Sequence, residues 1–325
     1  MASSICPSSI SPSLFGLRFG LGIDAGGTAT RWTLIKSNGD IIKQGQARGL
    51  TGLLMDSVEG RAQLAHELQQ IALTCSHHAD HLKGALSVFA GFTGLPDDIG
   101  PIKHLVADAL NVEAAKTTLV SDIELTHRAH FEPDQGFIVY AGTGSYASFV
   151  DCNATLHRCG ARGGILDDGG SGFWIARAAL SQVWRAEDEQ AGRWQQSSMA
   201  CALFEQLGGS DWNFTRQFVY GQSNAQMRGR MGLLATAVGA SADSDPLAKK
   251  ILIDAGIELA RLGNIMSRQF GGRPTIFAGR VFELHPIILE TAASHLNTSP
   301  EHPSERSQIQ SVASVAARIA LEPTS

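Results

Sequence analysis

Two short turns that combine glycine with threonine are the residues best suited to bind an anion. Residues 24–28 (DAGGT) and 141–145 (AGTGS) each follow directly after an apolar segment typical of a buried strand. Glycine lets the backbone approach a ligand closely, successive backbone N–H groups form a cradle for anions, and threonine adds a hydroxyl donor. One such turn would suit a tight hairpin equally well, but two similar turns predict a phosphate clamp. The clamp would consist of Gly26, Gly27, Thr28, Gly142, Thr143 and Gly144.

Two common nucleotide motifs are absent from the sequence. No GxxxxGK[ST] segment is present, and neither turn fits GxGxxG, so neither a Walker A loop nor a Rossmann dinucleotide site is expected. Three aspartates stand at the ends of predicted elements: Asp24 in the first turn, Asp122 after a predicted strand, and Asp168 before a predicted helix. Each has a structural interpretation, because aspartate favours turns and helix N-termini.

The elements that would position these residues occur twice along the chain. The first copy is predicted to have strands over 19–23, 31–35 and 41–46, with the first turn between its first two strands. The second copy has strands over 137–140, 146–151 and 154–158, with the second turn in the same place. Helices follow each three-stranded meander. Two copies about 117 residues apart indicate an internally duplicated α/β protein rather than a solenoid, whose repeats are roughly 20–50 residues long.

Length and composition limit the class of protein. At 325 residues the chain is long enough for two domains, and a net charge of −5 without a basic block argues against a nucleic-acid surface. No apolar run approaches the 18 residues of a membrane span. Five widely spread cysteines without a CxxC pair suit reduced thiols, so a cytoplasmic protein that does not bind membranes is expected.

Several motifs together resemble one known family. GIDAGGT, VSDIELTHRAH, YAGTGS and LDDGGSGFWIA stand in the order seen in the N-acetylglucosamine kinase branch of the actin/sugar kinase/Hsp70 ATPase superfamily, which includes the BadF/BadG-type ATPase domain. IFAGRVF resembles the adenosine motif of that family, and the resemblance covers about residues 20–321. It implies an α/β fold of two duplicated ribonuclease-H-like, actin-like ATPase domains, with ATP and sugar in an interdomain cleft.

The first residues, 1–17, are expected to be a disordered leader or an over-long start, and the small apolar face of a terminal helix over 309–325 is expected to return to the N-terminal domain. Between them, the resemblance implies an N-terminal ribonuclease-H-like domain over 18–120 and a C-terminal one over 121–308.

Site roles follow from the resemblance, residue by residue. Asp24 would lie near the nucleotide-bound Mg²⁺, and Asp122 would be the base that takes the proton of the sugar hydroxyl. Capping of a helix remains the competing interpretation of Asp122, although Ser121 could fill that role. Gly279 would join the two glycine turns in binding ATP. The residues implied to bind sugar are Asp122, Ser145, Arg162, Gly163 and Asp168.

The chain departs from the pattern of the family at several of these positions. Gly169 stands where many members have glutamate, and Asp167 where they have glycine. Arg162 stands where relatives often carry tryptophan, and it could read a polar or anionic substrate group. Arg280 replaces the usual second glycine of the adenosine motif, where its side chain could stack on adenine or obstruct it.

The expected function is therefore that of an enzyme, an ATP-dependent kinase that phosphorylates N-acetylglucosamine or glucosamine at the 6-hydroxyl. ATP and Mg²⁺ are the expected cofactors, a small sugar the expected substrate, and a homodimer the expected assembly. Two alternatives remain open. One is a BadF-type ATPase that activates a radical enzyme, and the other is a degenerate sugar-binding homologue of a kinase.

Overall fold

The computed structural model describes residues 18–27, 29–77, 82, 84–221, 224–297 and 311–322. Three expectations therefore lie outside the described residues: the leader over 1–17, the role of Thr28, and the start of the terminal helix at 309. The chain divides into two compact units. Unit 1 comprises residues 1–129 together with 309–325, and unit 2 comprises residues 130–308.

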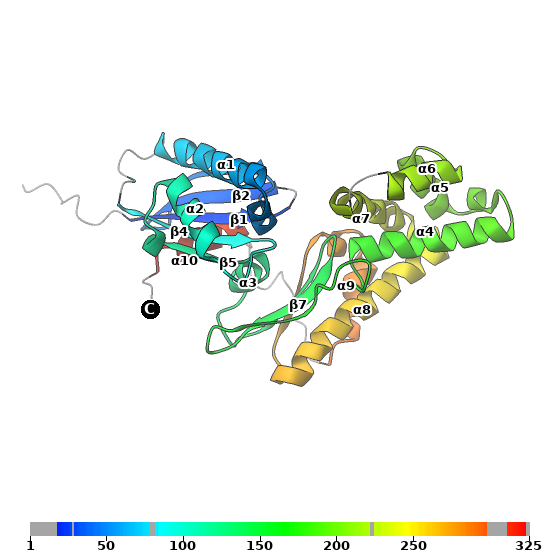
Figure 1. Ribbon diagram of the computed structural model, residues 1–325. Helices are drawn as coiled ribbons and strands as arrows, with labels where there is room; N and C mark the ends of the chain where they lie inside the picture. The colour runs from blue at the N-terminus through cyan, green and yellow to red at the C-terminus, as the bar shows by residue number, and fades with distance from the viewer. Residues whose placement is uncertain are drawn as a thin grey trace, which may run out of the picture. The chain divides into compact units, whose positions relative to one another are not determined.

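Unit 1 is built on a five-stranded sheet with the order β3-β2-β1-β4-β5 (Figure 1). The strands are β1 (Phe19–Ala25), β2 (Ala29–Lys36), β3 (Ile41–Arg48), β4 (Leu86–Phe92) and β5 (Thr117–Ser121). The first three form an antiparallel meander, whereas β1, β4 and β5 run parallel to one another. The carboxyl ends of these three parallel strands therefore meet at one edge of the sheet.

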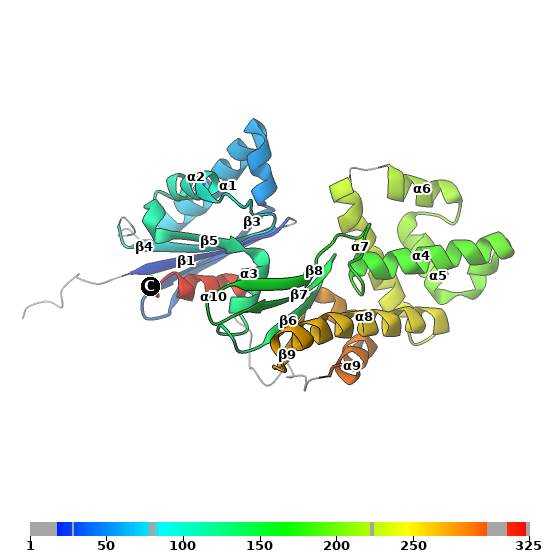
Figure 2. The same ribbon diagram turned by 60° about the horizontal axis from the view of Figure 1, so that its bottom comes forward.

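Helices cover both faces of the unit 1 sheet. Its helices are η1 (Gly52–Asp56), α1 (Val58–Ser76), α2 (Gly100–Leu110), η2 (Ala114–Lys116), α3 (Asp122–Arg128) and α10 (Val312–Ile319). Apolar side chains of α1 and α2 pack on one face, and α3 and α10 pack on the other, as Figure 2 shows. A Cβ at Gly20 or Gly22 of β1 would lie 2.0 Å from a carbonyl oxygen of α10, so glycine lets this helix lie directly on the strand.

Unit 2 is built on a four-stranded sheet with the order β8-β7-β6-β9. The strands are β6 (Phe137–Ala141), β7 (Ser145–Val150), β8 (Leu156–Gly160) and β9 (Thr275–Ala278). Again the first three form an antiparallel meander, and β6 pairs in parallel with a strand from much later in the chain. The repetition of the meander confirms the internal duplication that the two glycine turns predict.

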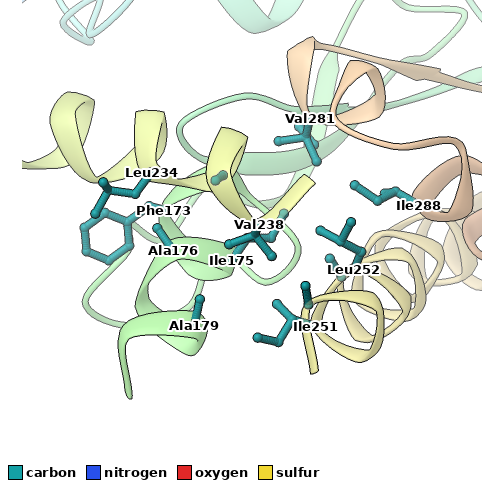
Figure 3. Packing of buried hydrophobic residues seen from close by; sticks show 14 of the residues in the cluster. Phe173, Ile175, Ala176, Ala179, Leu234, Val238, Ile251, Leu252, Val281 and Ile288 are labelled. Carbon is teal, nitrogen blue, oxygen red and sulfur yellow. The ribbon is translucent and has the colours of Figure 1, made fainter. Parts of the chain in front are cut away.

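One face of this second sheet carries the larger apolar core. The helices of unit 2 are α4 (Gly172–Glu189), η3 (Arg193–Gln196), α5 (Ser198–Leu207), α6 (Trp212–Tyr220), α7 (Asn224–Ser241), α8 (Pro246–Phe270), η4 (Arg280–Glu283) and α9 (Pro286–Ser294). Figure 3 shows Ile175 of α4, Val238 of α7, Leu252 of α8 and Ile288 of α9 converging in this core. Such packing fixes α7 and α4, the two helices that border the second glycine turn.

The structure differs from two expected boundaries. The units divide between residues 129 and 130, not between 120 and 121, because α3 packs on β4 and β5 of the first sheet. Strand β8 spans 156–160 rather than 154–158, because Ala154 has a left-handed φ of 60° in the preceding turn. Within the described residues, no helix is long and apolar enough to cross a membrane.

Candidate functional site

A small polar group lies at the carboxyl edge of the unit 1 sheet. Asp24 stands one residue before the end of β1, whereas Thr93 and Asp122 directly follow β4 and β5. Because these three strands are parallel neighbours, the three side chains share one edge. We call Asp24, Thr93 and Asp122 the carboxylate cluster. Gly91 lets α3 approach this edge, since a Cβ there would lie 2.6 Å from Leu125 Cδ2.

Asp122 is the first residue of α3 but does not cap it. The side chain of Ser121 is the cap, and its hydroxyl accepts a hydrogen bond of 3.1 Å from the backbone N–H of Glu124. Oδ1 of Asp122 accepts from the N–H of Ile123, and Oδ2 accepts from the hydroxyl of Thr93 at 2.7 Å. The Asp122 carboxylate is thus held in one orientation by two donors while the helix is capped by another residue.

Asp24 is partly buried on the same edge. Desolvation by burial raises the pKa of its carboxyl, the Arg31 guanidinium on β2 opposes this, and the charge of Asp122 adds to it. Arg31 is the direct cross-strand partner of Asp24. A partly desolvated carboxylate beside a second carboxylate favours a bound cation, because a cation would relieve the repulsion between them.

The first glycine turn is open to solvent beside this cluster. Gly27 is exposed, Gly26 closes the turn by donating to the carbonyl of Ala29, and neither has a left-handed backbone. A Cβ at Gly49 would lie 2.2 Å from the carbonyl oxygen of Gly27, so the segment after β3 packs on the turn. This segment therefore holds the backbone of the turn while Gly27 stays exposed.

The second glycine turn abuts the N-terminus of α4. The carbonyls of Gly142 and Thr143 accept the first two helix N–H groups, those of Gly172 and Phe173, and Ser171 caps the third. The side chain of Thr143 remains exposed. The turn is therefore fixed by the helix, and its hydroxyl is available to a ligand.

A pocket of about 320 Å³ opens above this turn within unit 2. Its lining comprises Gly142, Thr143, Gly172, Gly229, Gly232, Leu233, Thr236, Arg280, Val281, Glu283 and Leu284. The turn forms one end, α7 forms one wall and η4 forms the other. Gly232 lets α7 lie close to the turn, because a Cβ there would be 3.4 Å from the hydroxyl oxygen of Thr143. This volume is within the range of pockets that bind small ligands.

Two residues of the expected adenosine motif differ in position: Arg280 lines the pocket, whereas Gly279 is not part of the lining. Gly279 has a φ of 106°, and a Cβ there would lie 2.2 Å from the carbonyl oxygen of Ala141. Both features require glycine for backbone reasons, so Gly279 positions η4 against the end of β6. Arg280, in contrast, is exposed and contributes to the lining.

Asp168 is enclosed within unit 2. Its side chain is 1% exposed, Oδ1 accepts from the N–H of Gly163 at 3.0 Å, and Oδ2 accepts from Nη2 of Arg228 at 3.2 Å. Desolvation raises the pKa of this carboxyl, while the Gly163 and Arg228 donors lower it and the charge of Asp167 raises it. Asp168 also has a left-handed φ of 53°. Through its bond to Gly163, the Asp168 carboxylate stabilises the loop over residues 163–168.

The other residues expected to bind sugar lie around this loop. Ser145 is buried and donates a hydrogen bond of 2.7 Å to the carbonyl of Gly169. Gly163 adopts a φ of 85°, and Arg162 beside it is exposed. The expected set is thus divided: Arg162 faces solvent, whereas Ser145 and Asp168 hold the loop together.

Gly169, which departs from the family pattern, has a local physical reason to be glycine. A Cβ at this position would lie 2.8 Å from Oε2 of Glu258 on α8. Glu258 in turn pairs with Arg261, which also reaches Asp167 at 3.5 Å. The carboxylates near Gly169 are therefore partly neutralised by Arg261.

The sequence did not predict the wall of the pocket that α7 forms, nor the roles of Thr93 and Arg228. Thr93 follows a buried strand beside Gly94, and this resemblance to the two glycine–threonine turns could have identified it. Arg228 contacts Asp168 from 60 residues away, and nothing in the local sequence indicates that contact.

Comparisons with known proteins place the chain in a family. No curated protein matches it, but the model of the BadF/BadG/BcrA/BcrD ATPase family matches residues 21–294. Among solved structures, a candidate N-acetylglucosamine kinase from Chromobacterium violaceum is 19% identical with a TM-score of 0.70, covering 94% of this chain and 99% of its own. A candidate N-acetylglucosamine kinase from Porphyromonas gingivalis is 17% identical with a TM-score of 0.68, covering 86% and 92%.

A ROK family glucokinase from Streptomyces griseus, solved with glucose and AMPPNP, is 16% identical with a TM-score of 0.55 and covers 94% of this chain and 99% of its own. At these identities the structures show a shared fold, which confirms the expected duplicated α/β fold class. The family match covers most of the chain and confirms the resemblance read from the motifs. The chain belongs to the BadF/BadG/BcrA/BcrD ATPase family.

Proposed function

We propose that this protein is an ATP-dependent kinase that phosphorylates N-acetylglucosamine or glucosamine at the 6-hydroxyl. The proposal rests on the hydrogen bonding of Asp122: Thr93 orients its carboxylate, while Ser121 caps the helix. A base for an alcohol needs such a fixed carboxylate. The family match and the fold shared with proteins described as sugar kinases support the proposal.

The pocket of unit 2 suits a nucleotide. Its end is the turn of Gly142 and Thr143, and Gly229 and Gly232 leave one wall free of bulky side chains. A flat base could lie against such a wall, and the turn could receive the phosphates. Arg280 offers a guanidinium plane for stacking. We therefore propose that ATP occupies this pocket.

The carboxylate cluster suits a magnesium ion. Asp24 is partly desolvated and lies within the electrostatic influence of Asp122, so a divalent cation would be favourable there. Mg²⁺ commonly uses one or two carboxylates and keeps several waters, so Asp24 would suffice. When bound, Mg²⁺ would neutralise charge on the phosphates of ATP.

In the proposed reaction, the phosphoryl group passes from ATP to the sugar. The bond between the terminal phosphorus and the bridging oxygen breaks and leaves ADP, and a bond forms to the sugar 6-oxygen. The proton of that hydroxyl passes to Asp122. The roles of this chain are then to orient the alcohol, to take its proton and to hold the phosphates.

A coupled assay for ADP release tests this proposal. The substrates would be N-acetylglucosamine, glucosamine, glucose and N-acetylmannosamine, with a sugar-free sample. Release that depends on an amino sugar supports the kinase, and phosphorus NMR of the product would identify the 6-phosphate. ADP release that no sugar increases would instead favour an ATPase that activates another enzyme, and no release at all would favour a degenerate homologue.

We propose further that the enzyme acts as a cytoplasmic homodimer, since dimers are the commonest assembly of soluble proteins. Light scattering coupled to gel filtration measures the assembly: a mass near twice the 34.5 kDa of one chain agrees with this, and a mass near one chain contradicts it.

A further inference from the structure

Helix α7 carries a row of residues along the pocket of unit 2. Gly229, Gly232 and Thr236 line the pocket and are spaced three and four residues apart, which places them on one face of the helix. Gly232 lies against Thr143 in the second glycine turn. Thr236 is one turn beyond Gly232 in one direction, and Arg228 is one turn beyond it in the other, each about 6 Å along the axis.

The Arg228 side chain lies beside Gly144, the last glycine of the second glycine turn. A Cβ at Gly144 would be 3.7 Å from Nη2 of Arg228 and 2.9 Å from Oδ2 of Asp168. These two side chains are joined by a hydrogen bond of 3.2 Å. Because Gly144 has no side chain, the Asp168 carboxylate and the Arg228 guanidinium can lie against the turn.

The two members of this ion pair differ sharply in exposure. The side chain of Asp168 is 1% exposed, whereas that of Arg228 is 47% exposed. Asp168 is also fixed from its other oxygen by the N–H of Gly163. A guanidinium carries five N–H donors in a rigid plane, so the bond to Asp168 leaves donors on the exposed side for an anion. The Arg228 guanidinium is therefore held by Asp168 on one side and exposed to solvent on the other.

We propose that Arg228 binds the terminal phosphate of the nucleotide and stabilises the charge on the transferred phosphoryl group, with Asp168 as the residue that positions it. The inference rests on the proposed nucleotide site in the pocket. In this site the base of the nucleotide would lie toward Thr236 and its phosphates on the second glycine turn. Arg228, at the opposite end of the row from Thr236, would then lie beside the terminal phosphate. Arginine stabilises phosphoryl transfer effectively because its donors match phosphate oxygens.

Nucleotide binding without sugar provides the primary test, because it does not depend on which sugar is used. The affinities of ATP, ADP and AMP would be measured by calorimetry for the wild type and for Arg228→Ala. We expect the substitution to weaken ATP binding about ten- to a hundredfold, the size of one lost charged hydrogen bond, and to change ADP binding by less than about threefold. Equal losses for ATP and ADP, or no loss, would overturn the inference.

A matched control lies two residues away on the same helix. The guanidinium carbon of Arg230 lies over the ring of Phe218, 4.2 Å from the ring centroid, whereas Arg228 pairs with Asp168 beside Gly144 of the turn. Arg230→Ala should therefore keep the wild-type preference for ATP over ADP. Loss of that preference in Arg230→Ala as well would show a general effect of charge and would contradict the specific role of Arg228.

Removing Arg228 alone leaves Asp168 buried without its cation, so the variant could fail to fold. The double variant Arg228→Met with Asp168→Asn removes both charges and provides a second test. It should lose the same ATP preference while thermal unfolding remains cooperative. The single variant Asp168→Asn should lose part of that preference and lower kcat, with the KM of ATP rising less. Retention of the full ATP preference in the double variant would overturn the inference.

Measuring kcat with an amino sugar distinguishes a failure of the proposed role of Arg228 from a failure of the proposed kinase activity. In the presence of an amino sugar, Arg228→Ala should lower kcat by about 10³-fold, the lower end of the effect of an arginine at a transferred phosphoryl group. A wild type that shows no sugar-dependent ADP release would overturn the kinase proposal while the ATP and ADP affinities still decide the role of Arg228. A wild type that turns over, together with an unchanged Arg228→Ala, would overturn the inference alone.

Discussion

The hydroxyl of Thr93 donates a 2.7 Å hydrogen bond to Oδ2 of Asp122, which links the ends of two neighbouring strands. The helix that begins at Asp122 is capped by Ser121, so the carboxylate is not needed to terminate the helix. A carboxylate that is oriented by a neighbouring hydroxyl, and that is not the cap of its helix, is well suited to bind or deprotonate a substrate.

We expect Asp122→Asn to lower kcat by about 10²–10⁴-fold, the usual contribution of a general base. Binding of ADP should remain within about threefold of the wild type, and the midpoint of thermal unfolding should change little because Ser121 still caps α3. Steady-state kinetics and calorimetry measure the two effects. A variant with nearly normal kcat would show that Asp122 is not the base.

Thr93→Val should lower kcat about tenfold, because it removes one hydrogen bond to a charged group while conserving shape. Thr93→Ser retains a hydroxyl and should recover most of the activity. The comparison is made at constant pH with saturating ATP. If the serine and valine variants were equally impaired, the hydroxyl of Thr93 would not be the cause.

Asp24 should make folding stability depend on pH. Its folded pKa is raised above the usual 3.8, first by burial and then by Asp122, although Arg31 opposes the rise. Folding therefore favours its protonated form, and the contribution to the free energy of unfolding declines as pH rises from about 3.8 through the raised pKa. Asp24→Asn should remove this decline, so its stability relative to the wild type should be greater at pH 7 than at pH 3.5.

The same variant separates stability from function. If Asp24 contributes to a magnesium site, Asp24→Asn should need more Mg²⁺ for half-maximal activity and should lower kcat at least about tenfold. Denaturant titrations at both pH values and an Mg²⁺ titration of activity provide the measurements. A less stable variant at pH 7 with unchanged Mg²⁺ dependence would contradict both expectations.

Two glycines near the pocket should respond oppositely to alanine. At Gly144 the new Cβ would meet the Asp168 carboxylate at 2.9 Å, and Asp168 is held by Gly163 and Arg228, so a loss of about 1–3 kcal/mol in stability is expected. At Gly229 no heavy atom lies within 4 Å of the new Cβ, so helix propensity should raise stability by up to about 1 kcal/mol.

Because Gly229 lines the pocket, Gly229→Ala should nevertheless weaken ATP binding. Urea unfolding and calorimetry of ATP binding would compare the two variants. Equal stability of both, or tighter ATP binding by Gly229→Ala, would argue against this description of the turn and the pocket.

Much of the fold could be predicted from the sequence because its signals are local. The apolar runs and glycine turns around Asp24 and Thr143 define two meanders, and both appear within a few residues of their expected bounds. The pairing of distant segments could not be predicted in the same way. Strand β9 joins β6 after more than 130 residues, and no local signal in the sequence indicates that pairing.

The sites show the same division between local and distant information. The position of Asp122 after a strand follows from its neighbours in sequence, but the contact between Arg228 and Asp168 depends on how α7 packs. Gly169 is a similar case, because the carboxylate beside it comes from Glu258 on α8. Motifs therefore located the loops correctly, whereas the contacts of Asp168 became visible only in three dimensions.

The ratio of the ADP release rates with and without an amino sugar, measured on the wild type at saturating MgATP, decides whether this protein is a sugar kinase. A kinase that uses Asp122 as its base predicts release with N-acetylglucosamine or glucosamine at least about tenfold above the sugar-free rate, and loss of that increase in Asp122→Asn. Equal ADP release with and without every sugar, unchanged by Asp122→Asn, would show that the protein is not a sugar kinase that uses Asp122 as its base.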